Sequence, residues 1–105
     1  MNNNDIVIAG SARTPMGGMM GSLSTVRSPD LGAVAIKAAI ERSGLQPADI
    51  QEVIMGCVLP GGLGQAPARQ ASRASGIPDS SGCTTINKMC GSGMQAVIMA
   101  HDQIK

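Results

Sequence analysis

The 105-residue chain is long enough for one small layered domain and too short for a typical two-domain enzyme. Its formal net charge of +1, with both signs scattered along the chain, excludes a strongly basic surface for nucleic acid, and its lack of aromatic residues excludes base stacking. We therefore expect small, roughly neutral partners and a thin core filled by aliphatic side chains and flexible methionine.

The few cysteine and histidine residues argue against a disulfide framework and against a metal site. The three cysteines form an odd set without Cys-x-x-Cys spacing, and the chain has one histidine. No apolar run approaches the roughly 20 residues that a membrane-spanning helix needs, and no basic segment precedes the short apolar stretch near the start. We expect a cytoplasmic protein with no metal, no nucleic acid and no membrane among its partners.

The first predicted element is a strand at residues 5–12. Ile6–Ala9 form a short unbroken apolar run that ends at Gly10, which is typical of a buried parallel strand. Residues 13–27 contain Pro15 and several glycines, so they are predicted to form a long loop that carries three methionines. Loops of this length are often functional.

A helix is predicted to follow this loop. Ser28 can cap its start, Pro29 is tolerated in the first turn, and Asp30 favours the positive end of the helix dipole. Gly44 is placed to stop the helix. Its expected apolar face consists of Leu31, Val34, Ala35 and Ala38.

The middle of the chain predicts a second strand and a short helix. Residues 53–59 read as a buried strand interrupted by Gly56, and Pro60 ends it. After a glycine-rich segment, a helix is predicted over residues 67–74, opened by Pro67.

The last third predicts a strand at residues 83–87 and a helix from about Gly91 to the end. Its expected apolar face consists of Met94, Val97, Ile98 and Ile104. Because this pattern is still in phase at Ile104 and no stop residue follows, we expect the chain to end inside an element.

The order of these elements is strand then helix, three times over. This order predicts a three-layer α/β/α fold with a mainly parallel sheet. Three strands without aromatic side chains leave much apolar area uncovered, so we expect the fold to be incomplete in this chain.

Cys90 lies where the third predicted strand gives way to the last helix. Thiolate is the reactive form of cysteine, and a helix N-terminus stabilises an anion placed there. Gly91 and Gly93 permit a tight turn and clear side-chain bulk for a substrate carbonyl. The backbone amides of this Gly91-Ser92-Gly93 turn are candidates to receive a developing oxyanion. We therefore predict that Cys90 is a nucleophile.

The alternative for any cysteine is a buried side chain that behaves as a small hydrophobe. That alternative fits Cys57 and Cys83, which lie in predicted apolar strands. A nucleophilic cysteine also needs a base, normally histidine. His101 lies about 16 Å along the same helix at ~1.5 Å per residue, so it cannot reach Cys90, and the base is expected from outside this sequence.

Phosphate binding is a weaker hypothesis. Two glycine clusters lack the Walker A ending and the Gly-x-Gly-x-x-Gly spacing between a strand and a helix, so they are interpreted as loops. These clusters are Gly17, Gly18 and Gly21, and Gly61, Gly62 and Gly64. Three arginines are candidate phosphate contacts, although surface pairing with acidic residues is the favoured interpretation. They are Arg13, Arg69 and Arg73.

The chain resembles the N-terminal part of the thiolases, or acyl-CoA acetyltransferases, over essentially its whole length. SARTPMGGMMGSL resembles the opening strand and loop of that family, and ADIQEVIMGCVLPGGLGQAPARQA resembles its second strand and the helix that follows. INKMCGSGMQAV resembles the acyl-cysteine segment and is the most specific of the three. Residues 1–105 would then be the first part of the thiolase N-terminal domain, with the rest of that half and the whole C-terminal half absent.

The resemblance implies that Cys90 accepts an acyl group from acyl-CoA and passes it on, in the cleavage or synthesis of 3-ketoacyl-CoA, with acetoacetyl-CoA the expected substrate in fatty acid metabolism. Coenzyme A would be a substrate or product, with no prosthetic group. The activating histidine and a second acid/base cysteine would come from later in the chain. The resemblance also implies a five-layered fold and assembly of the protein as a homodimer or homotetramer.

Two departures from the family pattern are visible. Met16 stands where an aromatic residue is common, and Ala66 stands where asparagine is common after Gly-Gln. The alternatives to a thiolase are a condensing enzyme of the ketoacyl synthase type, a non-catalytic module that keeps the fold, and a fragment with no independent role. Alone, this chain is expected to be inactive.

Overall fold

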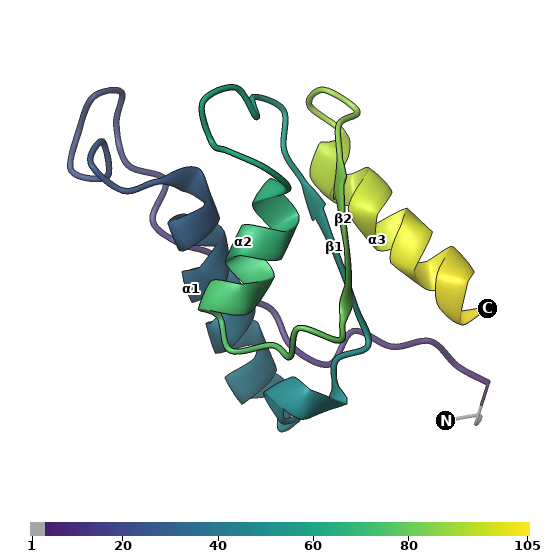
Figure 1. Cartoon of the computed structure of the whole chain (residues 1–105). Coiled ribbons are helices and arrows are strands. Elements are labelled where there is room, and N and C mark those ends of the chain that lie inside the picture. The colour runs from purple at the N-terminus through teal and green to yellow at the C-terminus, as the bar shows by residue number, and fades with distance from the viewer. Residues whose placement is uncertain (1–3) are drawn as a thin grey trace.

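The structure is a computed structural model that describes residues 4–105 (Figure 1). Its elements follow in the order α1 (Ser28–Ser43), the short 3-10 helix η1 (Pro47–Asp49), β1 (Glu52–Gly56), α2 (Pro67–Ala74), β2 (Gly82–Ile86) and α3 (Ser92–Ile104). β1 and β2 pair in parallel, with Val53 opposite Cys83 and Gly56 opposite Ile86, and α2 lies in the crossover between them.

Three layers are stacked around this two-stranded sheet. α1 and α2 pack against each other on one face of the sheet, where α2 contacts both strands and Ile40 of α1 joins Val53 of β1 in the core. α3 packs against the strands from the other face (Figure 1). The predicted three-layer α/β/α fold with a parallel sheet is therefore confirmed, with two strands in the part of the chain that the structure describes.

The predicted strand at residues 5–12 is wrong. The segment has no ladder partner within residues 4–105, and the Ile8 side chain is 82% exposed. It runs instead past the C-terminal half of α1, where Arg42 Nη1 donates a hydrogen bond to the carbonyl oxygen of Ser11 at 2.8 Å. A Cβ on Gly10 would lie 2.5 Å from the Ala39 carbonyl oxygen. An apolar run favours a strand, but a strand also requires a neighbour for its backbone groups.

α1 has the predicted length, but its start and its buried face differ from the prediction. Arg27 rather than Ser28 is the N-cap, without a side-chain cap. Gly44 ends the helix as predicted, in a left-handed conformation (φ 77°). Val34 is 61% exposed. The other three residues of the predicted face are half-buried. Gly32 lies against Ala71, where an added Cβ would lie 3.2 Å from the Ala71 Cβ. The buried residues of α1 are Pro29, Ala33 and Ile40.

The core is aliphatic and small. Ile40, Val53 and Ile77 form its buried centre. The partly buried residues Ile36, Ile50, Met55 and Cys83 pack around that centre. Methionine contributes less than predicted, because the three methionines of the 13–27 loop are exposed. β1 is also shorter than predicted: it ends at Gly56, and Leu59 beyond it is exposed.

α3 packs its small residues against β1. Ser92 and Ala96 are buried, whereas the face predicted to be buried points outward, with Met94 74% exposed. The reason is a close approach at Gly56, where an added Cβ would lie 2.6 Å from the Ser92 carbonyl carbon and 2.8 Å from the Gly93 nitrogen. Only a surface of small residues fits at this separation. The exposed apolar residues of α3 are Met94, Val97, Ile98 and Ile104.

Ala66 begins α2 in an unusual backbone conformation. It is the N-cap, with φ 50° and ψ 69°, and it makes no side-chain cap hydrogen bond. Asparagine tolerates the left-handed region and also caps helices well. The departure from the family pattern noted for Ala66 therefore places the less suitable side chain at a position whose geometry favours asparagine.

We expect Ile40→Val to lower the free energy of unfolding by about 1 kcal/mol, because it leaves a methyl-sized cavity in the core. Ile8→Val is the matched control: the same change at an exposed position is expected to stay within about 0.5 kcal/mol. Urea denaturation followed by circular dichroism measures both. Equal losses would mean that residues 5–12 are buried after all.

We expect Gly56→Ala to destabilise the fold by roughly 1–3 kcal/mol, because the new methyl group meets the backbone of α3 rather than a movable side chain. Gly61→Ala is the control, since a Cβ there has nothing within 4 Å. NMR chemical shifts of Ser92 and Gly93 report the displacement of the helix. Unchanged shifts and stability in Gly56→Ala would contradict the close contact.

We expect Ala66→Asn to raise the free energy of unfolding by about 1 kcal/mol, through lower backbone strain and a new helix cap. Ala66→Gly supplies only the backbone freedom and is expected to gain less. Thermal and urea denaturation of the unsubstituted chain and the two variants measure the order of their stabilities. If Ala66→Asn is no more stable than the unsubstituted chain, the left-handed conformation at this position is wrong.

Candidate active site

Cys90 lies at the edge of the sheet where both strands end. It follows β2 by four residues and precedes α3 by two, and its thiol is free and exposed. The loops after β1 and β2 lie at the same end of the sheet (Figure 1). Asn87 Nδ2 joins these loops by donating to the Val58 carbonyl oxygen at 3.2 Å. The carboxyl ends of parallel strands are the usual place for a ligand site in α/β folds.

The turn before Cys90 contains a residue with a left-handed backbone. Met89 has φ 48°, which is uncommon for a residue with a side chain and costs on the order of 1–3 kcal/mol. Gly91, by contrast, has φ −93°, a value open to any residue. The predicted role of the glycines in making the turn is therefore incomplete, because the strained left-handed position of the turn is occupied by Met89.

Side chains on both sides of the turn hold its backbone. The Met89 N–H donates to Asn87 Oδ1 at 2.9 Å, and the Lys88 N–H donates to Ser92 Oγ at 2.9 Å. Ser92 Oγ in turn donates to the Met89 carbonyl oxygen at 2.6 Å. Ser92 is 4% exposed, so its hydroxyl is shielded from competing water.

Some backbone N–H groups of the turn donate hydrogen bonds within the fold, and others do not. The Gly91 N–H donates to the Lys88 carbonyl oxygen at 3.0 Å, and the Ser92 N–H donates to that of Met89 at 3.1 Å. These two amides already have partners, which corrects the expectation that they are free for an oxyanion. Within residues 4–105, the N–H groups of Cys90 and Gly93 have no hydrogen-bond acceptor.

The space beside the two glycines is open. A Cβ on Gly93 would have no neighbour within 4 Å, and one on Gly91 would have its nearest neighbour at 3.5 Å, an ordinary contact. The described part of the fold therefore does not require glycine at either position for packing. The room is consistent with the predicted approach of a reactant to the sulfur.

His101 is separated from Cys90 by most of the length of α3, as the sequence predicts. Its Nδ1 lies 3.1 Å from Asp102 Oδ1 on the exposed side of the last turns. The other two cysteines, Cys57 and Cys83, are half-buried rather than fully buried. Cys90 is therefore the most accessible thiol, and the described residues bring no histidine to it.

The arginines predicted as possible phosphate contacts are held by other groups. Arg73 Nε forms an ion pair with Asp79 Oδ1 at 3.0 Å, which confirms the favoured interpretation for this residue. Arg69 Nη1 donates to the Asp79 carbonyl oxygen at 3.4 Å. Arg13 Nη1 donates to the neighbouring Thr14 carbonyl oxygen at 3.0 Å.

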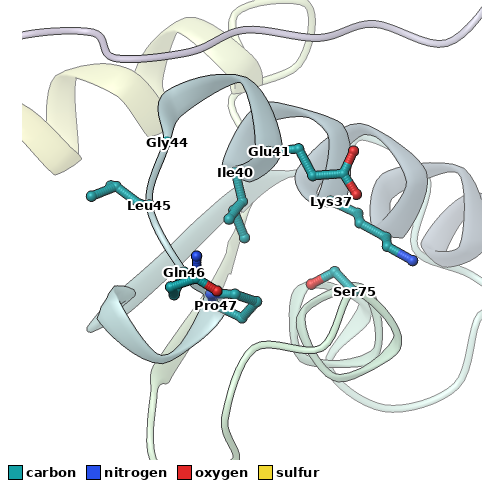
Figure 2. A pocket seen from close by; sticks show the side chains of 8 residues that line it. All are labelled: Lys37, Ile40, Glu41, Gly44, Leu45, Gln46, Pro47 and Ser75. Carbon is teal, nitrogen blue, oxygen red and sulfur yellow. The ribbon is translucent and has the colours of Figure 1, made fainter.

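A cavity of about 400 Å³ lies at the far end of α1, away from Cys90. Figure 2 shows Ile40 of α1 and Ser75 at the end of α2 on its two sides, with Pro47 of η1 near the first. It is lined by Lys37, Ile40, Glu41, Gly44, Leu45, Gln46, Pro47 and Ser75. This set contains no cysteine and no histidine, and Cys90 does not line the cavity.

The described part of the chain also bears on metal binding and on membrane crossing. Residues 4–105 contain no group of three or more His, Cys, Asp or Glu side chains arranged to hold a metal ion. No helix among these residues combines the length and the apolar character needed to cross a membrane.

Sequence reasoning missed three contributions to the site. Gly56 was interpreted as an interruption of a strand, and Asn87 entered only as part of a family pattern. Met89 was given no role. The Asn-x-x-Cys spacing is the one available signal, because asparagine readily accepts a hydrogen bond from the backbone two residues on. Nothing in the local sequence marks the left-handed backbone of Met89.

Comparison with known proteins places this geometry in a family. A sequence model described as "Thiolase, N-terminal domain" matches residues 6–105. Acetyl-CoA acetyltransferase 2 of Arabidopsis thaliana is 53% identical over 105 residues, covering 100% of this chain and 26% of that protein. Acetyl-CoA acetyltransferase of Cupriavidus necator is 52% identical over 100 residues, covering 95% of this chain and 25% of that protein.

A solved structure agrees with these sequence matches. The Acat5 thiolase from Ascaris suum, crystallised in complex with coenzyme A, superposes with a TM-score of 0.89 at 47% identity, over 92% of this chain and 25% of that one. The chain spans about a quarter of the length of the curated relatives it matches. With a match to the thiolase N-terminal domain over nearly its whole length and the same fold, the chain belongs to the thiolase family.

Proposed function

We propose that this chain supplies the acyl-accepting nucleophile of an acetyl-CoA acetyltransferase. The observation that carries the proposal is the exposed thiol of Cys90 at the start of α3, beside backbone N–H groups without acceptors. Relatives named acetyl-CoA acetyltransferase support the thiolase reaction over that of a ketoacyl synthase or a non-catalytic module.

In the proposed reaction the Cys90 thiolate attacks the thioester carbonyl carbon of an acyl-CoA. A new bond forms between Sγ and that carbon, and the bond between the carbon and the coenzyme A sulfur breaks. The coenzyme A thiolate leaves and takes up a proton. In synthesis the acyl group then passes to the enolate carbon of another acyl-CoA, and its bond to Sγ breaks. In degradation the Cys90 thiolate instead attacks the 3-keto carbon of a 3-ketoacyl-CoA, the bond from that carbon to C2 breaks, and the acetyl-CoA enolate leaves and takes up a proton. The acyl group is then transferred from Sγ to coenzyme A.

The developing negative charge on the thioester oxygen needs hydrogen-bond donors. The N–H groups of Cys90 and Gly93 are the candidates in this chain, because those of Gly91 and Ser92 already have acceptors. Gly93 thus keeps its proposed oxyanion role, whereas Gly91 and Ser92 shape the turn.

The ligands proposed for the site are acyl-CoA, expected to be acetoacetyl-CoA, and coenzyme A, with no prosthetic group. The Ascaris suum relative binds coenzyme A, which supports this choice. No histidine of the described residues reaches Cys90, so turnover requires residues that this chain does not contain. Assembly as a homodimer or homotetramer, a cytoplasmic location and a place in fatty acid metabolism stay predictions.

We expect limiting iodoacetamide to label Cys90 about tenfold faster than Cys57 or Cys83, because its thiol is exposed at a helix N-terminus whereas the others are half-buried. Peptide mapping by mass spectrometry after short reaction times measures the three rates in one sample. Cys90→Ser is the control that identifies the labelled peptide.

The same labelling in urea removes the effect of the fold, and the three rates are expected to converge. If the three cysteines of the folded chain already react at equal rates, the proposed nucleophile is wrong.

A further inference from the structure

The two residues before Cys90 have every backbone polar group satisfied. The Lys88 N–H and carbonyl oxygen pair with Ser92 Oγ and the Gly91 N–H, at 2.9 and 3.0 Å. The Met89 N–H pairs with Asn87 Oδ1 at 2.9 Å, and its carbonyl oxygen accepts from both the hydroxyl and the N–H of Ser92. The next backbone N–H, that of Cys90, has no acceptor within residues 4–105.

This closed arrangement depends on two side chains that come from different elements. Asn87 follows β2 and is also tied to the loop after β1 through the Val58 carbonyl oxygen. Ser92 is the first residue of α3 and lies against Gly56 of β1. Together they connect the Met89 backbone to both strands and to the helix.

Besides satisfying polar groups, these hydrogen bonds act on a residue with an unfavourable backbone conformation, Met89. A left-handed backbone at a residue with a side chain is unfavourable, and it persists only when the surroundings over-determine it. Here two side chains fix the residue from both directions, and Cys90 is the next residue along the chain. Strain of this kind, next to a nucleophile, is a device for holding a reactive atom in place.

We propose that Asn87 and Ser92 are positioning residues for acyl transfer, which hold Met89 in its left-handed conformation and thereby fix the Cys90 thiol and its N–H at the open end of α3. The inference rests on the proposed function of Cys90. Neither side chain takes part in the chemistry itself, because each acts through the backbone of residues 88 and 89.

The test compares Asn87→Ala and Ser92→Ala with Ser81→Ala in the full 105-residue chain. Ser81 is a matched control: it is also a buried serine beside β2, its hydroxyl also donates to a backbone carbonyl, that of Ile50 at 2.6 Å, and it lies at the opposite end of the strand. NMR couplings and chemical shifts of Met89 report its φ angle. Iodoacetamide labelling reports the reactivity of Cys90 relative to Cys57.

In both Asn87→Ala and Ser92→Ala, Met89 is expected to leave the left-handed region, and the labelling rate of Cys90 is expected to fall roughly three- to tenfold relative to Cys57. Ser81→Ala is expected to leave both readouts unchanged. Asn87→Asp keeps an acceptor for the Met89 N–H but replaces the donor to Val58 by an oxygen and adds a negative charge near Cys90. It is therefore expected to retain the Met89 conformation, whereas the added charge by itself slows the labelling of Cys90. Unfolding is recognised separately, because it raises the labelling of Cys57.

A left-handed Met89 in both alanine variants would overturn the inference. The inference would also fail if Met89 left the left-handed region while the labelling rate of Cys90 stayed unchanged. It would fail as well if Ser81→Ala changed both readouts as much as the two alanine variants do. If an alanine variant unfolds, Asn87→Asp decides, and loss of the Met89 conformation in that variant would count against the role of Oδ1. A failure of the proposed function is seen elsewhere: the unsubstituted chain would then label Cys90 no faster than Cys57.

Discussion

The close contact between Gly56 of β1 and the first turn of α3 is the constraint on which the rest of the site depends. Because an added Cβ would lie 2.6 Å from the Ser92 carbonyl carbon, the helix can start directly against the strand only if that strand residue is glycine. The contact buries Ser92 and brings its hydroxyl to the backbone of residues 88 and 89. The position of Cys90 follows from this packing.

The fold and the chemistry are thus linked through small residues rather than through a large core. α1 approaches α2 where Gly32 meets Ala71, and α3 approaches β1 where Ser92 and Ala96 are buried. A chain without aromatic side chains builds three layers by bringing its backbones close together. As a consequence, the larger apolar side chains of α3 point outward, and the helix start is set by backbone contacts that resist adjustment.

Sequence reasoning predicted the parts of this arrangement that depend on local signals. Pro67 and Gly44 correctly marked a helix start and a helix end, and the position of Cys90 between a strand and a helix was predicted correctly. It failed where the outcome depends on partners distant in sequence. Ile6–Ala9 read as a strand but have no ladder neighbour, and the periodicity of α3 did not reveal which face meets β1. The left-handed backbone of Met89 likewise results from Asn87 and Ser92, which no local propensity records.

The most direct measurement of the central claim is the location of the acyl group after the folded chain is incubated with acetyl-CoA. Thiol exchange with a thioester needs an accessible thiolate. A single acetyl transfer to Cys90 is therefore expected even though no histidine of the described residues lies near this thiol. Acid quenching followed by peptide mapping should find the acetyl group on the peptide that contains Cys90, and on neither of those that contain Cys57 and Cys83. An acetyl group spread over all three cysteines, or found on none of them, would contradict the account.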